Sequence, residues 1–284
     1  MLPARLGEWY IAKAGTGDGT NVTLLDVVLV ALISGLGEAL PLGASAHLAL
    51  LPAMAAAADQ RAAVAAAADL GIACALSVYF WRDMAAMGLG LFRLAKGRSD
   101  SGARLFFQLL IGTLPAALLG SAFAHFAAHP GGRTMVAAAM LVFGLFLLVA
   151  DRLGMTVRRI DHLGLAGTFA VGILQAAALI PGVARVGVAI TAARLMGCER
   201  REAARLALLL SIPLLASSAL SLVWSLRGHL VVSADLAGAA GIAFLAALAA
   251  CAFMMAWVRR NSFAPFAVWR ILLGGAMLIG IFWR

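Results

Sequence analysis

Two stretches of the chain place polar and ionisable residues inside otherwise apolar segments. The first reads Ser34-Gly-Leu-Gly-Glu-Ala-Leu-Pro-Leu-Gly-Ala-Ser-Ala-His47, and the second reads Leu179-Ile-Pro-Gly-Val-Ala-Arg-Val-Gly187. An ionisable residue at membrane depth costs roughly 2.5 to 3.5 kcal/mol on insertion scales, so such residues indicate a functional site. The first stretch supplies a carboxylate and an imidazole, and the second supplies a guanidinium.

Glu38, His47 and Arg185 are the residues that could do chemistry there. Arg185 can bind a phosphate group through two parallel hydrogen bonds. Glu38 can ligate a metal ion or take a proton, and His47 can act as a nucleophile or as an acid/base. Helices that begin just after Gly43 and Gly182 would direct free N–H groups and positive dipole ends at the same place. This combination favours phosphate chemistry on a lipid whose apolar tail leaves between helices.

Simpler interpretations of these residues stay open at this point. Glu38 and Arg185 could form a structural ion pair, and His47 could be an interior histidine with satisfied hydrogen bonds. Asp69 also lies in an apolar block, where it could add a carboxylate to the site or sit near the outer boundary of the membrane. Intramembrane charges usually mark substrate or ion pathways, which favours the functional interpretation.

The composition places the chain in a membrane. Of its 284 residues, 63% are hydrophobic and 12% are charged, which is too few charges for a surface that faces water on all sides. The formal net charge of +9 could indicate a nucleic-acid partner. However, the arginines lie in short connections between apolar blocks, with no basic run that carries interleaved aromatic residues. The sequence therefore predicts a multi-pass membrane protein that does not bind nucleic acid.

The apolar blocks predict both spanning helices and interrupted ones. Six blocks have about the length of roughly 20 residues that a spanning helix needs; they are 62–81, 105–127, 133–150, 203–226, 236–258 and 264–283. Blocks 24–52 and 163–197 are too long for one span and too short for two, and each is broken in its middle by Pro and Gly. We expect both to be re-entrant helix pairs that turn inside the membrane and leave on the side they entered.

The distribution of basic residues predicts the orientation. Connections 82–104 and 152–162 are rich in arginine and should be cytoplasmic. Residues 1–23 form an N-terminal extension without the apolar core of a signal peptide. The remaining chain divides into a first repeat, 24–150, with an outward-opening re-entrant pair and three spans, and a second repeat, 163–284, with an inward-opening pair and three spans. The predicted fold class is an all-α polytopic membrane protein, with six transmembrane helices and two re-entrant pairs in an inverted repeat.

Both motifs resemble those of the bacterial undecaprenyl-pyrophosphate phosphatases of the BacA type, and the likeness covers nearly all of the chain after residue 24. The family's first motif, approximately Glu-Gly-Leu-Thr-Glu-Phe-Leu-Pro-Val-Ser-Ser-Thr-Gly-His, corresponds to 34–47. Its second motif, Pro-Gly-Phe-Ser-Arg-Ser-Gly-Ala-Thr-Ile-Ser, corresponds to 181–191. The resemblance implies hydrolysis of undecaprenyl diphosphate to the monophosphate at the outer face of the bacterial inner membrane, with a divalent cation, Mg²⁺ or Ca²⁺. It also implies a polyprenyl diphosphate lipid as partner and a homodimer as one option.

The resemblance assigns catalytic roles to Glu38, His47 and Arg185, and a metal-binding role to Glu38, with Asp69 as a second candidate. The substrate-binding positions that it implies are Ser34, Gly43, Ala44, Ser45, Gly182, Ala184 and Thr191. Several of these depart from the family pattern, because Ser34 stands where the family has a glutamate and Gly43 and Ala44 stand where it has serines. Fewer oxygen ligands weaken a site for a hard cation. A non-catalytic descendant that binds or translocates a polyprenyl phosphate is therefore the alternative, and the nucleophile stays open among His47, Ser45 and water.

Overall fold

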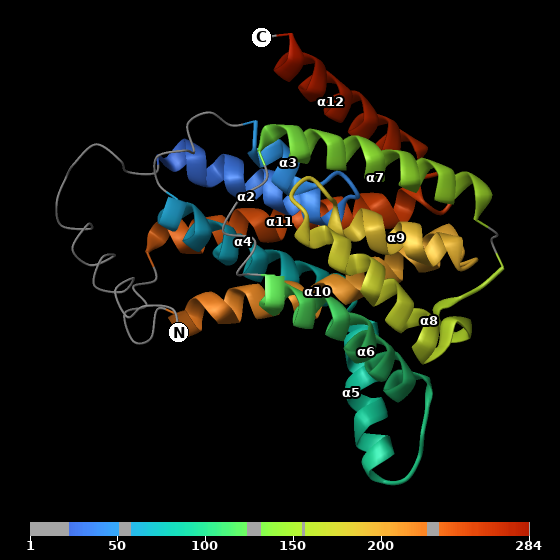
Figure 1. Cartoon of the computed structure of the whole chain (residues 1–284). Coiled ribbons are helices and arrows are strands. Elements are labelled where there is room, and N and C mark those ends of the chain that lie inside the picture. The colour runs from blue at the N-terminus through green and yellow to red at the C-terminus, as the bar shows by residue number, and fades with distance from the viewer. Residues whose placement is uncertain (1–22, 51–57, 124–131, 155–156, 226–232, 284) are drawn as a thin grey trace.

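The computed structural model describes residues 23–50, 58–123, 132–154, 157–225 and 233–283. These residues form helices and no β-strand (Figure 1). In chain order the helices are α2 (Leu24–Ala39), α3 (Ala44–Leu48), α4 (Ala58–Tyr79), α5 (Trp81–Ala95), α6 (Ser101–Phe123), α7 (Arg133–Leu153), α8 (Ile160–Gln175), the 3₁₀ helix η2 (Ala176–Leu179), α9 (Arg185–Leu195), α10 (Arg200–Ser225), α11 (Ala234–Trp257) and α12 (Ala264–Phe282). The predicted N-terminal extension before Thr23 lies outside the described residues, as do most of the connections 128–132 and 227–235 between predicted spans.

The all-α polytopic fold class is confirmed. Six segments of the described helices are long and apolar enough to cross a membrane; they are Ser101–Leu119, Arg133–Leu153, Ile160–Leu179, Arg200–Leu220, Ala234–Trp257 and Ala264–Phe282. Five of these correspond to predicted spans. The sixth, Ile160–Leu179, forms the first arm of the second predicted re-entrant pair. Its length and composition would also allow it to cross the membrane completely.

The region after the first predicted span differs from the expected cytoplasmic loop. The chain bends by 79° between α4 and α5, and these two helices reach the length and composition of a span only as a bent pair. Much of the predicted 82–104 loop is therefore helical. Helix α5 is amphipathic, with Met87 and Gly90 buried and Arg82 and Arg93 exposed. A side chain on Gly90 would collide with the backbone of α6, so α5 lies directly on α6. Together α5 and the start of α6 extend beyond the main bundle at the lower edge of Figure 1.

Both predicted interruptions are present. The first lies between α2 and α3, and the second lies between η2 and α9. In each, a glycine adopts a positive φ, 85° at Gly43 and 94° at Gly182, a backbone conformation that side chains with a Cβ rarely adopt. The arms after the breaks differ in length, because α9 runs for 11 residues whereas α3 runs for only five. The helix predicted to start just after Gly43 is present as α3, but with five residues it carries only a short dipole.

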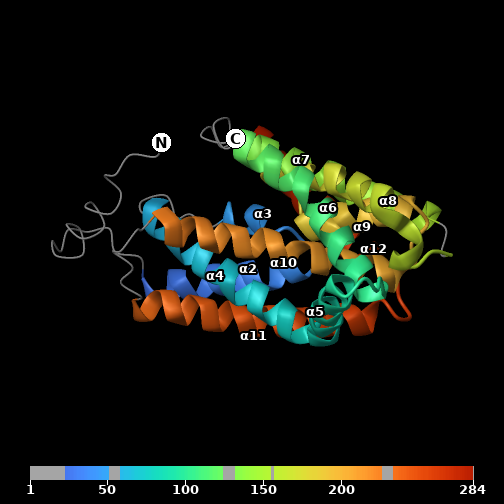
Figure 2. The same cartoon turned by 90° about the horizontal axis from the view of Figure 1, so that it is seen from below.

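Small residues hold the helices in close pairs. Gly112 of α6 and Gly172 of α8 face each other so closely that a side chain on Gly172 would overlap the carbonyl of Gly112. Gly144 of α7 and Gly274 of α12 likewise leave no room for a side chain against the opposing helix. Close approach of this kind increases the van der Waals contact that drives helix association in membranes. The pairs α4–α11 and α2–α11 complete the packing, and α9 lies between α7 and α8 (Figures 1 and 2).

Candidate active site

The two interruptions meet. The Ser45 hydroxyl oxygen accepts a hydrogen bond of 3.1 Å from the backbone N–H of Gly182. A Cβ on Gly43 would lie 3.5 Å from the Cβ of Ala184, and one on Gly187 would lie 3.6 Å from the Cβ of Pro41. The turns at Gly43 and Gly182 are far apart in the sequence but in direct contact in the fold. The small side chains at this contact permit the close approach.

Glu38 and Arg185 face each other across this junction. Their closest charged atoms, Glu38 Oε2 and Arg185 Nε, are 3.9 Å apart, and the two side chains are 18% and 26% exposed. A structural carboxylate–guanidinium pair usually closes to about 2.7 to 2.9 Å with hydrogen bonds. Here Glu38 Oε2 and Arg185 Nη1 are buried and have no hydrogen-bond partner among the described residues. Buried polar atoms are rarely left without partners, so both groups are available to a ligand that lies between or beside them.

The start of α9 adds to the anion-binding character of the junction. Arg185 is the first residue of α9, and no side chain caps this helix end. The first N–H groups of a helix have no partner within the helix and carry the positive end of its dipole. A phosphate oxygen at this end would therefore meet backbone N–H groups as well as the guanidinium.

His47 is held by hydrogen bonds at both ring nitrogens. Its Nδ1 lies 2.9 Å from the carbonyl oxygen of Gly43, and its Nε2 accepts a 3.0 Å hydrogen bond from the indole N–H of Trp269. Because a carbonyl only accepts and an indole N–H only donates, this network assigns the proton to Nδ1. The imidazole and indole planes are nearly parallel, at 3°, with ring centroids 6.3 Å apart. His47 is therefore neutral and oriented, and its reactive lone pair faces Trp269.

Arg270 is a functional candidate that the sequence reasoning missed. It lies in α12, is fully buried, and donates from Nη2 to the carbonyl oxygen of Gly182 at 3.3 Å. Its Nε and Nη1 have no hydrogen-bond partner among the described residues, and a Cβ on Gly187 would lie 2.7 Å from Nη1. Arg270 thus brings a second positive charge to the first turn of α9. An arginine inside the apolar block 264–283 was the signal that could have identified it.

The other predicted positions contribute in different ways. Ser34 is buried in α2 one turn before Glu38, on the same helix face. Ala44 packs against Gly37 where α2 and α3 approach each other most closely. The Thr191 hydroxyl donates to the carbonyl oxygen of Gly187 at 2.7 Å, so its hydrogen bond stays within α9 instead of reaching the junction.

The carboxylates near the junction fit a divalent cation only together with a bound phosphate ligand. Asp69 interacts electrostatically with both Glu38 and Arg185, and its Oδ2 accepts a 2.6 Å hydrogen bond from the Ser218 hydroxyl. Among the described residues, no three His, Cys, Asp or Glu side chains gather closely enough to hold a metal ion by themselves. Mg²⁺ is commonly held by one or two carboxylates together with substrate phosphate oxygens. Glu38 offers one such carboxylate oxygen, because its Oε2 has no hydrogen-bond partner among the described residues.

The chain is similar in sequence to known proteins of one family. The profile of the family described as "Bacitracin resistance protein BacA" matches residues 27–276. The undecaprenyl-diphosphatase 1 of Paramagnetospirillum magneticum is 47% identical over 259 residues, which cover 90% of this chain and 97% of the relative. The undecaprenyl-diphosphatase 1 of Rhodospirillum rubrum is 47% identical over 266 residues, covering 90% and 94%. The undecaprenyl-diphosphatase of Moorella thermoacetica is 38% identical over 266 residues, covering 92% and 99%.

Proposed function

Because this chain belongs to the BacA family, we propose that it is a multi-pass membrane enzyme that hydrolyses undecaprenyl diphosphate to the monophosphate. The reaction would recycle the lipid that carries cell-envelope precursors. The observation that carries the proposal is the open pair of Glu38 and Arg185, whose facing atoms are 3.9 Å apart at the junction of the two broken segments. An anionic headgroup that enters there would meet two arginines, one carboxylate and an uncapped helix end, while its isoprenoid chain stays between apolar helices.

The proposed reaction transfers the terminal phosphoryl group to water. The water oxygen forms a bond to the terminal phosphorus, and the bond from that phosphorus to the bridging oxygen breaks. The bridging oxygen stays on the lipid monophosphate, inorganic phosphate leaves, and the proton of the attacking water passes to a base. Water attacks the diphosphate directly, or His47 Nε2 or Ser45 Oγ (after its proton passes to a base) first displaces the bridging oxygen. In the second route water then breaks the bond between the phosphorus and that residue. In each route positioning and charge stabilisation provide most of the rate enhancement.

Each residue at the junction has a role in this proposal. Arg185 and Arg270 stabilise the charge on the equatorial phosphoryl oxygens. Glu38, with Asp69 in support, would hold a divalent cation, which would neutralise charge on the diphosphate when bound. His47 uses Nε2 as base or nucleophile, which requires that the Trp269 N–H release that nitrogen. Ser45 presents its hydroxyl beside the start of the second motif, where its proton can bond to a phosphate oxygen.

The side of the membrane is also part of the proposal. The basic connections predict that the first re-entrant pair opens outward, so the site would act on lipid at the outer face of the bacterial inner membrane. A homodimer is compatible with this arrangement, since each chain contains its own complete junction.

Phosphate release tests the proposal directly. Purified protein supplied with undecaprenyl diphosphate and Mg²⁺ or Ca²⁺ should release inorganic phosphate. His47→Ala and Glu38→Gln should each lower turnover by two or more orders of magnitude, as expected for loss of a base or a charge-positioning group. Lipid binding should largely persist, because Arg185 and Arg270 stay in place. His162→Ala and Glu199→Gln serve as matched controls and should retain activity.

The carrier alternative predicts a different result. If the parent protein binds the lipid but releases no phosphate with any divalent cation, the enzymatic proposal fails and a lipid-binding or lipid-translocating role replaces it. Equal phosphate release by the parent and by both site variants would instead show that the junction is not the catalytic centre.

A further inference from the structure

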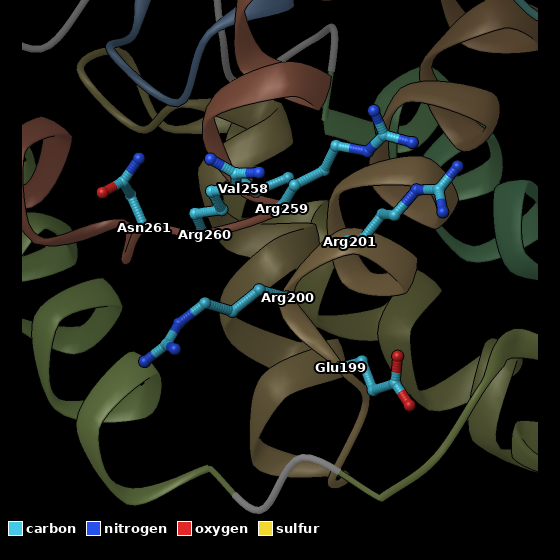
Figure 3. A pocket seen from close by; sticks show the side chains of 7 residues that line it. All are labelled: Glu199, Arg200, Arg201, Val258, Arg259, Arg260 and Asn261. Carbon is cyan, nitrogen blue, oxygen red and sulfur yellow. The ribbon is translucent and has the colours of Figure 1, made fainter.

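A second cationic site lies away from the junction of the two motifs. A cavity of about 420 Å³ is bounded by the start of α10 and by the connection between α11 and α12. Its charged lining consists of four arginines and one glutamate, namely Arg200, Arg201, Arg259, Arg260 and Glu199 (Figure 3). In this view the guanidinium groups of Arg201 and Arg259 extend to the same side of the cavity, and that of Arg200 extends to the opposite side.

The walls of the cavity are fixed by the protein itself. Asp151, at the end of α7, accepts a 2.7 Å hydrogen bond from Nε of Arg200 and a 2.9 Å hydrogen bond from the backbone N–H of Phe263. This one buried carboxylate therefore ties the start of α10 to the start of α12. The Trp257 indole N–H donates to the carbonyl oxygen of Ser262 at 3.0 Å and closes the connection between α11 and α12. These hydrogen bonds hold in place the backbone segments that carry the arginines.

The remaining arginines of the cavity have not been neutralised. In the described part of the chain, ion pairs include Arg200 with Asp151 but none that involves Arg201, Arg259 or Arg260. Arg201, at the start of α10, and Arg259, just after α11, both line the cavity and extend to the same side of it (Figure 3). Like charges held close together repel each other, and an anion between them relieves that repulsion.

We propose that this cavity binds the phosphate of an anionic membrane lipid headgroup. It lies at the ends of two candidate spans, Arg200–Leu220 and Ala234–Trp257, where headgroups are found. Trp257 is a half-buried aromatic residue at the same end of α11, as is typical of the interface between membrane and water. Guanidinium groups match phosphate oxygens bidentately, and basic pockets between transmembrane helices bind anionic headgroups. The leaflet is the one that the basic connections predict to be cytoplasmic.

Lipid binding to the purified full chain tests this assignment. Native mass spectrometry of protein in detergent, titrated with phosphatidylglycerol or with phosphatidylcholine, should show preferential binding of phosphatidylglycerol. Arg201→Ala and Arg259→Ala should each weaken that binding about fivefold, and the double variant about 30-fold, as expected for removal of basic residues near a membrane surface. The control R98A/R104A removes the same charge from exposed positions outside the cavity and should change binding less than twofold. Phosphate release from undecaprenyl diphosphate should be unchanged in the cavity variants, since they leave Glu38 and Arg185 in place.

Several results would overturn the proposal. One is equal affinity of the R201A/R259A variant and the parent for phosphatidylglycerol, and another is equal affinity of the parent for both lipids. A third is binding of inorganic phosphate that depends on Arg201 and Arg259 while no lipid is retained, which would make the cavity a site for the free anion. If the double variant does not fold, as judged by its melting transition, the two single variants decide the matter through their fivefold losses.

Discussion

His47 and Trp269 show how single residues from distant parts of the chain make one reactive group. The imidazole of His47 forms hydrogen bonds with the Gly43 carbonyl at Nδ1 and with the Trp269 N–H at Nε2. A base or nucleophile must present a lone pair, and the only lone pair of this neutral ring is occupied by the indole. Trp269 therefore positions His47 before substrate arrives and must release it for reaction.

Trp269→Phe tests this positioning role, because it keeps an aromatic ring and removes the N–H donor. Without the indole N–H, only part of the His47 population keeps its proton on Nδ1 and presents Nε2, so kcat should fall about fivefold, with little change in KM, since substrate binding rests on the arginines. Nitrogen NMR of labelled His47 should show the Nδ1–H tautomer in the parent and a mixture of tautomers in the variant. Trp283→Phe, at an exposed position, is the control. An unchanged tautomer and an unchanged kcat in Trp269→Phe would remove Trp269 from the site.

At the scale of secondary-structure elements, the turns at Gly43 and Gly182 differ in how tightly they are packed. Both need a residue with positive φ, but their surroundings differ. A Cβ at Gly43 would meet its nearest neighbour, Ala184, at 3.5 Å, which is ordinary contact. A Cβ at Gly182 would lie 2.3 Å from the carbonyl oxygen of Val136, so α7 would have to move. The second turn is therefore held more tightly against its neighbours than the first.

Alanine at each turn should separate backbone strain from steric overlap. Gly43→Ala should destabilise the fold by about 1 to 2 kcal/mol, the cost of a left-handed conformation for a residue with a Cβ. Gly182→Ala should cost a further 1 to 3 kcal/mol from overpacking against α7. Thermal unfolding in detergent measures the difference, with Gly88→Ala as a control, because nothing surrounds a Cβ at that helical position. A larger loss for Gly43→Ala than for Gly182→Ala would contradict the packing of the second turn on α7.

At the scale of the whole molecule, the inverted repeat of 24–150 and 163–284 stays a prediction, and four helix pairs are those that it would require. Helix α2 of the first repeat packs on α11 of the second, and α8 of the second packs on α6 of the first. If α2 corresponds to α8 and α6 corresponds to α11, the contact between α2 and α11 is the counterpart of the contact between α8 and α6. The pairs α4–α10 and α7–α12 each join one helix from either repeat. A twofold axis in the membrane plane would relate such pairs and place the site near the midplane.

Cysteine labelling tests the orientation that goes with this repeat. A cysteine introduced at position 98 should react only with reagent supplied from the cytoplasm, and one at position 130, outside the described residues, only from the outside. Background from native Cys198 should be small, because burial raises the pKa of its thiol to about 11. Labelling of position 98 from the outside would invert the orientation, and the proposed site would then open to the cytoplasm.

The sequence by itself determined the class of protein, most of the spans and the positions of both breaks. These features depend on local properties: the length of an apolar run, a proline or glycine inside it, and the cost of a buried charge. Glu38, His47 and Arg185 stood out for the same reason. The helix α5 was missed because five basic residues between positions 82 and 104 resemble a loop, although only Arg82 and Arg93 lie in α5, which is amphipathic. The start of α3 was predicted but its short length was not, because apolar composition alone does not set where a helix ends.

Only the tertiary structure decided which side chains share the site. Arg270 and Trp269 come from α12, and their contacts with Gly182 and His47 depend on how that helix is rotated and how closely it packs on α7. The same holds for Asp151, which joins α10 to the start of α12. Such contacts join residues far apart in sequence, and they follow from the packing of small residues between helices. Hydropathy and motif spacing carry no information about helix rotation, so these partners became visible only in the folded chain.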